Sequence, residues 1–386
     1  MTYKFIPVSK PHLPAEGFRN VIKVLKSGYW STGEEVNKFE KALCRYLGGE
    51  LSGVGLSSCT AGLFLTLKAL GIKTDDEIIL PTFTFVATAH IVEWLGAKPV
   101  FVDIDYKTFN IDVEKIPSAI TKKTKAIIPV HFAGLPCDIM NITKISRKNN
   151  LLVIEDAAHA LGAMYKGKKI GNYSDGTVFS FYATKNLATG EGGMVVTRNK
   201  LLSDKIRRLS YFGMDIGQRG KSRKKGWQYE VTELGYKYNM DNIHAAIGLS
   251  QLRILAKNNK KRRLLAKLYI DQLFDIDWIE LPAESEDAIS NWHLFPIKID
   301  FDKLGLTRKY LVDFLRKNNI EVSVHFRPLH MHPYYRKKYG YKGNDFPISK
   351  KAFYREISLP LFPEMKEDEV KFVCKKIKSL KKSSAK

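Results

Sequence analysis

Lys185 stands where a lysine is seldom found, directly after an apolar strand and before a cluster of glycines. The strand is expected over 177–182, within the segment TVFSFYATKN, and the glycines are Gly190, Gly192 and Gly193. Loss of solvent around an amine disfavours its charged form and lowers its pKa. An uncharged lysine amine is a nucleophile toward carbonyl groups. The sequence therefore predicts Lys185 as a catalytic nucleophile.

A carboxylate and a hydroxyl accompany this lysine. Asp156 follows an apolar run at 151–154, and Ser180 lies in the strand before Lys185. An unpaired carboxylate at the end of a buried strand is costly. A protonated pyridine nitrogen is a suitable partner, because the ion pair lets the ring take up the electrons of a carbanion. Each residue alone has an ordinary structural interpretation, but together at strand ends they predict an enzyme that uses pyridoxal phosphate (PLP).

An anion site is expected at 57–62, SSCTAG, where a short strand leads into a helix over 60–70. A helix N-terminus presents free backbone N–H groups and the positive end of the helix dipole. The Thr60 hydroxyl and the Ala61 N–H would hold a phosphate together with Ser180. The alternative is that Thr60 only caps the helix.

Strands and helices alternate from residue 54 to residue 197, which predicts an α/β fold with a mostly parallel sheet and helices on both faces. Ligands of such sheets bind beyond the carboxyl ends of the strands. A chain of 386 residues exceeds the usual single core. We therefore expect a large PLP-binding domain over 1–255 and a smaller C-terminal α+β domain over 256–386, linked by a long helix that starts near residue 241. The later strands are expected at 278–280, 293–299 and 321–325, and the later helices at 304–318 and 367–380.

The formal net charge is +23, which raises the possibility of a nucleic-acid partner. The lysines are spread, however, and their local runs lack interleaved aromatic residues, so a solvated basic surface and a basic tail over about the last ten residues are favoured. No run approaches 18 apolar residues, so no membrane span is expected. Four scattered cysteines without a CxxC motif indicate reduced thiols in a cytoplasmic protein. No cysteine or carboxylate cluster accompanies the histidines at 325, 330 and 332, so no metal is expected.

Several segments resemble the DegT/DnrJ/EryC1/StrS family of PLP-dependent sugar-nucleotide aminotransferases. They cover nearly the whole chain: SSCTAGL, PTFTFVATAH, IEDAAHALGAMYKGKKIG, SFYATKN, GEGGMVVT, GYKYNMDNIHAAIG, NWHLFPIKID and VSVHFRPLHMHPYYR. The resemblance implies the aspartate aminotransferase fold (fold type I) and a homodimer with active sites at the subunit interface. It also implies L-glutamate as amino donor, a nucleotide-linked keto-sugar as acceptor, and pyridoxamine phosphate as the intermediate form of the cofactor.

Carried over by position, the resemblance implies a catalytic lysine, an acid facing the pyridine nitrogen, three phosphate ligands, an aromatic ring stacked on the cofactor and a residue beside the ring hydroxyl. The lysine is Lys185 and the acid is Asp156. The phosphate ligands are Thr60, Ala61 and Ser180, the stacked ring is Phe85, and the residue beside the ring hydroxyl is His159. The segment GYKYN would reach the phosphate in the partner subunit's site, through Asn239 in preference to Lys237. Relatives often read SFHPTK before the lysine, where this chain has Tyr182 and Ala183.

Substrate contacts are expected from the loops 28–33 and 213–230 and from the segment around residue 325. The candidate residues are Trp30, Thr32, His325 and Arg327. A guanidinium suits either a diphosphate or the carboxylate of glutamate. A subgroup of the family has histidine in place of the lysine and dehydrates sugars, so the presence of Lys185 favours transamination.

The sequence thus predicts transfer of an amino group from L-glutamate to carbon 4 of a UDP- or dTDP-linked 4-keto sugar. Such a reaction serves amino-sugar biosynthesis for lipopolysaccharide or another surface polysaccharide. Amination at carbon 3 is the near alternative. An alternative of another class is a non-enzymatic basic protein that binds nucleic acid.

Overall fold

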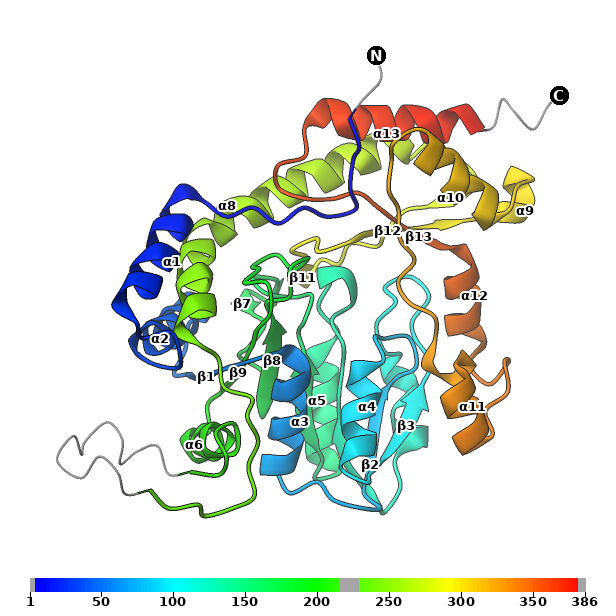
Figure 1. The fold of residues 1–386 in the computed structure, drawn as a ribbon. Helices are drawn as coiled ribbons and strands as arrows, with labels where there is room; N and C mark the ends of the chain where they lie inside the picture. The colour runs from blue at the N-terminus through cyan, green and yellow to red at the C-terminus, as the bar shows by residue number, and fades with distance from the viewer. Residues whose placement is uncertain (1–3, 215–228, 381–386) are drawn as a thin grey trace.

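The computed structural model describes residues 4–214 and 229–380. Most of the predicted substrate loop 213–230 and the end of the predicted basic tail lie outside the described residues. A large sheet with helices on both faces occupies the lower part of Figure 1, and a smaller sheet lies above it.

The large sheet has seven strands in the order β1-β9-β8-β5-β4-β2-β3. Only β9 runs against its two neighbours, so the predicted mostly parallel sheet is confirmed. The strands are β1 (Ser52–Leu56), β2 (Glu77–Pro81), β3 (Lys98–Val102), β4 (Thr124–Ile127), β5 (Leu152–Asp156), β8 (Gly176–Ser180) and β9 (Gly193–Thr197).

Successive side chains of these strands point to opposite faces, and each face packs against its own set of helices. Val178 lies in the core with α3, α4 and α6, whereas Phe179 lies in the core with α2, α5 and α8. The first set is α3 (Cys59–Ala69), α4 (Ala87–Trp94) and α6 (Lys200–Leu209); the second is α2 (Glu34–Leu47), α5 (Ile139–Lys148) and the start of α8 (Asn242–Leu273).

The 32-residue helix α8 rises along one side of the molecule and connects the two sheets. It packs against α1 (Ala15–Ser27) and α2 in its first half and against α13 (Glu367–Ser379) near its end. The predicted boundary between residues 255 and 256 falls within this helix, and the division into two domains stays a prediction.

The smaller sheet is antiparallel, with β12 (Phe295–Ile299) between β10 (Ile279–Glu280) and β13 (Glu356–Leu359). Its core contains the buried rings of Tyr269 and Phe295, stacked 4.8 Å apart. The helices of this part are α9 (Phe301–Leu304), α10 (Arg308–Lys317), α12 (Pro347–Arg355) and α13. Helix α11 (Pro333–Tyr339) lies instead beside the large sheet, where Tyr335 packs in the core that contains Val178. The remaining elements are β6 (Met164–Tyr165), β7 (Lys168–Lys169), β11 (Ala288–Ile289) and the 3-10 turns η1 (Val113–Lys115), η2 (Pro117–Ala119), η3 (Phe132–Gly134) and η5 (Leu329–Met331).

Two predicted elements of the C-terminal part are wrong. The segment 321–325 is not a strand, because it forms only a single bridge, between Ser323 and Ser358. The backbone N–H of His325 instead donates a hydrogen bond to a carboxylate oxygen of Glu356 at 2.8 Å. The helix expected over 304–318 is broken, because Gly305 adopts a left-handed conformation that ends α9 and Thr307 then caps α10. The strand β13 was not predicted.

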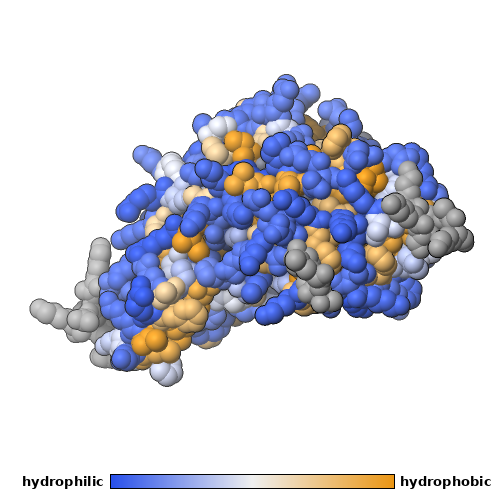
Figure 2. All heavy atoms as spheres, turned by 90° about the horizontal axis from the view of Figure 1, so that it is seen from above, coloured by the Kyte–Doolittle hydropathy of each residue, from blue (hydrophilic) through white to orange (hydrophobic). Residues whose placement is uncertain are grey.

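The face that carries α13 shows mainly hydrophilic side chains, with smaller groups of hydrophobic ones, the clearest at the lower left of the view (Figure 2). Among the described helices, none is both long and apolar enough to cross a lipid bilayer.

Candidate active site

The carboxyl ends of β5 and β8 bring the predicted acid and hydroxyl to one edge of the sheet. Asp156 is the last residue of β5 and Ser180 the last of β8, and the two strands pair in parallel. Ser180 lies opposite Gly193 of β9, which runs directly past the start of α3. A Cβ on Gly193 would lie only 2.5 Å from the backbone nitrogen of Cys59, so this close approach of strand and helix requires glycine.

Lys185 lies at this edge and is partly buried. Burial lowers the pKa of its amine to about 8, although the nearby Cys59 and Asp156 oppose this change. Among the described residues, its Nζ atom has no hydrogen bond or ion pair. Its charge in turn lowers the pKa of His159, His293 and His325, which places these side chains around it. The predicted catalytic lysine therefore lies among groups from four other segments of the chain, which contain Cys59, Asp156 with His159, His293, and His325.

The Asp156 carboxylate is buried and held by two donors. The Thr88 hydroxyl donates to Oδ2 at 2.8 Å, and the backbone N–H of Ala158 donates to Oδ1 at 3.1 Å. Burial raises the pKa of Asp156, while these two hydrogen bonds and the charge of Lys185 oppose the rise. Sequence reasoning missed Thr88. The sequence offers one signal for Thr88: it carries a hydroxyl three residues after Phe85, within PTFTFVATAH. A buried carboxylate such as that of Asp156 needs a hydrogen-bond donor.

Glu155, the neighbour of Asp156, faces the other side of the sheet. Its carboxylate lies 2.8 Å from Nε2 of His131 and accepts hydrogen bonds from Ser174 and Thr177 at 2.6 and 2.7 Å. Burial by itself lowers the pKa of His131, but the contacts of His131 with Cys137 and Glu155 outweigh burial and raise that pKa to about 10. The two adjacent carboxylates therefore have different surroundings, and only Asp156 points to the lysine.

His159 is a neutral histidine with a defined tautomer. The backbone N–H of Ala133 donates to its Nδ1 at 3.3 Å, so the ring hydrogen lies on Nε2. Burial, together with the charges of Lys185 and His325, holds its pKa well below the ordinary value. Its ring lies 4.3 Å from that of His293. Sequence reasoning missed His293 as a site residue. Its Nδ1 lies 3.1 Å from the side-chain oxygen of Asn186, the residue after Lys185.

The two phenylalanines of PTFTF have different environments. Phe83 is fully buried against Phe109 and Phe132. The side chain of Phe85 is 57% exposed, and its ring contacts that of Phe326 at 5.9 Å. An open ring face is what stacking on a flat cofactor requires, so the geometry agrees with the choice of Phe85.

The start of α3 is capped by Ser58 and not by Thr60. The hydroxyl oxygen of Ser58 accepts the backbone N–H of Ala61 at 3.0 Å, so the alternative role of Thr60 as the cap is wrong. Within the described residues, the Thr60 hydroxyl has no hydrogen-bond partner. The Ser180 hydroxyl accepts one long hydrogen bond, from the Tyr182 N–H at 3.4 Å. Both hydroxyls are thus available as donors, whereas the Ala61 N–H would have to be shared with Ser58.

A second group of predicted residues gathers at the end of β1. Asn239 bridges to Leu56, its side-chain amide donates to the Thr32 hydroxyl, and the ammonium of Lys237 donates to its side-chain oxygen. Both candidates in GYKYN therefore lie at one place. The nearby Trp30 is 54% exposed and donates its indole N–H to the carbonyl of Leu25 at 3.0 Å.

His325 and Arg327 take different positions. His325 lies near Lys185, and burial together with the charge of that lysine lowers its pKa to about 4. Arg327 is exposed and donates to the carbonyl of Met331 at 2.9 Å. In the part of the chain that the structure describes, no group of His, Cys, Asp and Glu side chains is arranged as a metal site.

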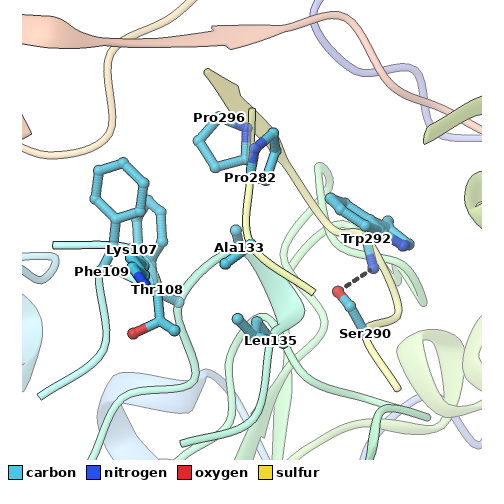
Figure 3. A pocket seen from close by; sticks show the side chains of 11 residues that line it. Lys107, Thr108, Phe109, Ala133, Leu135, Pro282, Ser290, Trp292 and Pro296 are labelled. Atoms are coloured by element: carbon cyan, nitrogen blue, oxygen red, sulfur yellow. Dashed lines mark hydrogen bonds between the residues drawn. The ribbon is translucent and has the colours of Figure 1, made fainter. Parts of the chain in front are cut away.

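A small pocket lies close to this site, since it is lined by Ala133, which contacts His159, and by Trp292, the neighbour of His293. Its lining side chains include Phe109, Ala133, Leu135 and Trp292, and the hydroxyl of Ser290 accepts the backbone N–H of Trp292 at 3.0 Å (Figure 3). Its volume of about 20 Å³ leaves room for a single water molecule. It is therefore too small for a sugar or a cofactor.

Comparison with known proteins identifies the family. The model of the DegT/DnrJ/EryC1/StrS aminotransferase family matches residues 11–378. The spore coat polysaccharide biosynthesis protein SpsC of Bacillus subtilis is 43% identical, over 98% of each chain. The chain belongs to this family.

Solved structures of aminotransferases have the same fold as this chain. Spr1654 of Streptococcus pneumoniae, described as a sugar aminotransferase and solved in its PMP-form, is 30% identical and superposes with a TM-score of 0.91 over 98% of this chain and 99% of its own. Helicobacter pylori PseC, an aminotransferase involved in pseudoaminic acid biosynthesis, is 29% identical with a TM-score of 0.92 over 98% of this chain and 100% of its own. The predicted fold, the transaminase activity and the PLP cofactor of this DegT-family chain are confirmed.

The residues of this DegT-family site fit the cofactor. The hydroxyls of Thr60 and Ser180 and the amine of Lys185 are hydrogen-bond donors without an acceptor among the described residues, and α3 adds the positive end of its dipole. Such a donor set suits a phosphate and an aldehyde. A buried carboxylate with two donors suits a protonated ring nitrogen, and the open face of Phe85 suits the ring itself.

Proposed function

We propose that this DegT-family aminotransferase moves an amino group from L-glutamate to a nucleotide-linked keto-sugar. Carbon 4 of a UDP- or dTDP-linked 4-keto sugar is the acceptor position that we favour. The proposal is carried by Lys185, a partly buried amine with a pKa of about 8 beside the buried carboxylate of Asp156.

PLP supplies an aldehyde carbon that carries the amino group and a ring that takes up the electrons of the substrate carbanion. In our proposal, Lys185 first holds the aldehyde and then moves protons with its Nζ. It removes the proton from the amine-bearing carbon of glutamate, and it returns a proton to the sugar carbon that receives the nitrogen. A lysine with an ordinary pKa would be charged at neutral pH and unable to accept this proton, so the environment of Lys185 suits the role.

The other residues hold and orient the cofactor in this proposal. Asp156 faces the ring nitrogen and keeps it protonated, with Thr88 fixing the carboxylate. The Nε2–H of His159 donates to the ring hydroxyl, since its Nδ1 is already occupied by Ala133. Thr60, Ser180 and the start of α3 bind the phosphate.

We further propose a homodimer in which Asn239 or Lys237 completes the phosphate site of the partner subunit. The observation behind this is that Asn239, Lys237 and Thr32 form one exposed hydrogen-bonded group. Trp30, Thr32 and Arg327 would contact the substrate from its periphery. The exposed guanidinium of Arg327 is suited to an anionic group such as a diphosphate.

The names of two relatives support a role in amino-sugar formation for a surface polysaccharide. PseC takes part in pseudoaminic acid biosynthesis, and SpsC in spore coat polysaccharide biosynthesis. A cytoplasmic location is part of the proposal, because all four cysteines of the chain are free and buried, as in proteins of reducing compartments.

The test is incubation with L-glutamate and a panel of nucleotide-linked 3-keto and 4-keto sugars, with the products identified by mass spectrometry and NMR. We expect 2-oxoglutarate and a 4-amino sugar from the wild-type protein. Lys185→Ala should give neither product, whereas Lys200→Ala, which changes an exposed lysine on α6, should behave as wild type. Amination of a 3-keto sugar alone would overturn the choice of carbon 4, and an active Lys185→Ala variant would overturn the mechanism.

A further inference from the structure

His325 is connected to two buried side chains of β13 that have no role in the site described above. Its Nδ1 lies 2.9 Å from the hydroxyl oxygen of Ser358, and that oxygen lies 2.5 Å from Oε1 of Glu356. The second carboxylate oxygen of Glu356 accepts the backbone N–H of His325 at 2.8 Å. Ser358 and Glu356 are both fully buried, and β13 lies in the upper sheet beside β12 (Figure 1).

This hydrogen-bond chain has two possible directions, because a hydroxyl both donates and accepts. With Glu356 ionised, Ser358 donates to Oε1, its oxygen accepts the Nδ1–H of His325, and Nε2 carries no hydrogen. With Glu356 protonated at Oε1, the carboxyl donates to Ser358, the Ser358 hydroxyl donates to Nδ1, and the hydrogen of the neutral ring is on Nε2. Oε2 stays an acceptor in both cases, since it accepts the backbone N–H.

We propose that Ser358 and Glu356 set the tautomer of His325, so that Nε2 carries a hydrogen while Glu356 is protonated and loses it when Glu356 is ionised. The change releases one proton in total. Nε2 loses its hydrogen, Ser358 passes its own to Nδ1, and Glu356 passes its own to Ser358. Ser358 and Glu356 are thus positioning residues that act through His325.

The charged groups around His325, Ser358 and Glu356 allow Glu356 to be either protonated or ionised near neutral pH. Burial raises the pKa of Glu356 to about 8, with Ser358, the His325 N–H and Arg308 of α10 opposing the rise. Lys298, opposite Glu356 on β12, directs its ammonium to the carbonyl of Tyr106 at 2.8 Å. The charged or titratable groups that face His325 are Lys185, His159 and His293.

The consequence for catalysis rests on the proposed function. A neutral imidazole with a hydrogen on Nε2 donates to an oxygen acceptor, such as the keto oxygen of the sugar or a carboxylate oxygen of glutamate. The same ring without that hydrogen would present a lone pair to these oxygens and repel them. The kcat/KM for the substrate should therefore fall as Glu356 becomes ionised.

The direct test is 15N NMR of the holoenzyme labelled in its histidine rings, which needs no substrate. The chain has nine histidines, so the signals of His325 are assigned by comparison with His325→Gln. We expect the hydrogen of His325 on Nε2 at pH 6.5 and on Nδ1 at pH 9.5. A hydrogen on the same nitrogen at both pH values would overturn the proposal, whatever the substrate of the enzyme proves to be.

Glu356→Gln is the matched variant, because the amide can donate to Ser358 as a protonated carboxyl does but cannot lose that hydrogen. The pH-dependent change of tautomer should vanish in this variant and in Ser358→Ala, and it should persist in Glu280→Gln, which alters a half-exposed carboxylate on β10 of the same sheet. If Glu356→Gln changes tautomer with pH as the wild type does, Glu356 does not set it.

The kinetic counterpart is the pH profile of kcat/KM for whichever keto-sugar is accepted. Between pH 7 and pH 9.5 the wild-type value should fall about thirtyfold more than that of Glu356→Gln, given a midpoint near 8. If the wild type and Glu356→Gln have equal pH profiles, the tautomer of His325 does not affect catalysis. A failure of the keto-sugar proposal, by contrast, would leave the NMR result intact.

Discussion

The lowered pKa of Lys185 predicts how fast the cofactor-free protein combines with PLP at each pH. A change from the ordinary 10.5 to about 8 corresponds to about 3.4 kcal/mol of preference for the uncharged amine. At pH 7 about one Lys185 amine in ten is then uncharged, against about one in three thousand for an ordinary lysine. Since only the uncharged amine attacks the aldehyde, the rate should rise about tenfold per pH unit below 8 and level off above it.

The assay is stopped-flow absorbance of the apoenzyme with saturating PLP between pH 6 and pH 10.5. Free Nα-acetyl-lysine is the control, and its rate should keep rising to the upper end of this range. Asp156→Asn should move the midpoint of the protein below 8, because the charge of Asp156 raises the pKa of Lys185. A rate that climbs past pH 10 as it does for the free amine would refute the reasoning.

Three further changes test other parts of the structure. Thr88→Val removes a hydrogen bond to the charged form of Asp156, so the affinity of the apoenzyme for PLP should fall about tenfold in a fluorescence titration, and an unchanged affinity would contradict the assigned role. Arg262→Met removes a buried guanidinium that donates to three backbone carbonyls, and urea unfolding should show a loss of about 2–4 kcal/mol, against about 0.5 kcal/mol or less for the exposed Lys260→Met. Glu155→Gln breaks a buried ion pair and should lower the free energy of unfolding by about 3 kcal/mol at pH 7, with PLP affinity unchanged; weaker PLP binding at equal stability would place Glu155 in the cofactor site instead.

Much of the large sheet and the centre of the site could be predicted from the sequence. Apolar runs ending in polar residues mark the ends of parallel strands, and the fold brings those ends to one edge. The strand-end positions of Asp156 and Ser180, and the place of Lys185 shortly after them, follow from this local pattern, whereas their roles at the cofactor stay predictions. The separation of Glu155 from Asp156 also follows from strand geometry, since adjacent residues face opposite sides of a sheet.

Contacts between side chains far apart in the chain could not be predicted. The hydrogen bond from Thr88 to Asp156 joins α4 to β5, and the contact of His293 with Asn186 depends on how the C-terminal part packs on the large sheet. The segment 321–325 has the alternation of a strand, but its N–H at His325 is taken by a side chain of β13. β13 itself is short and contains a charged residue, Glu356, whose burial no local pattern reveals.

The measurement that tests the central claim most directly is identification of the lysine that binds the cofactor. The protein is incubated with PLP, reduced with borohydride to make the bond to the lysine permanent, digested, and analysed by mass spectrometry. The phosphopyridoxyl group should be found on Lys185, in the peptide that contains SFYATKN, and at no comparable level on any other lysine. Modification spread over the many surface lysines, with Lys185 unmodified, would contradict the account.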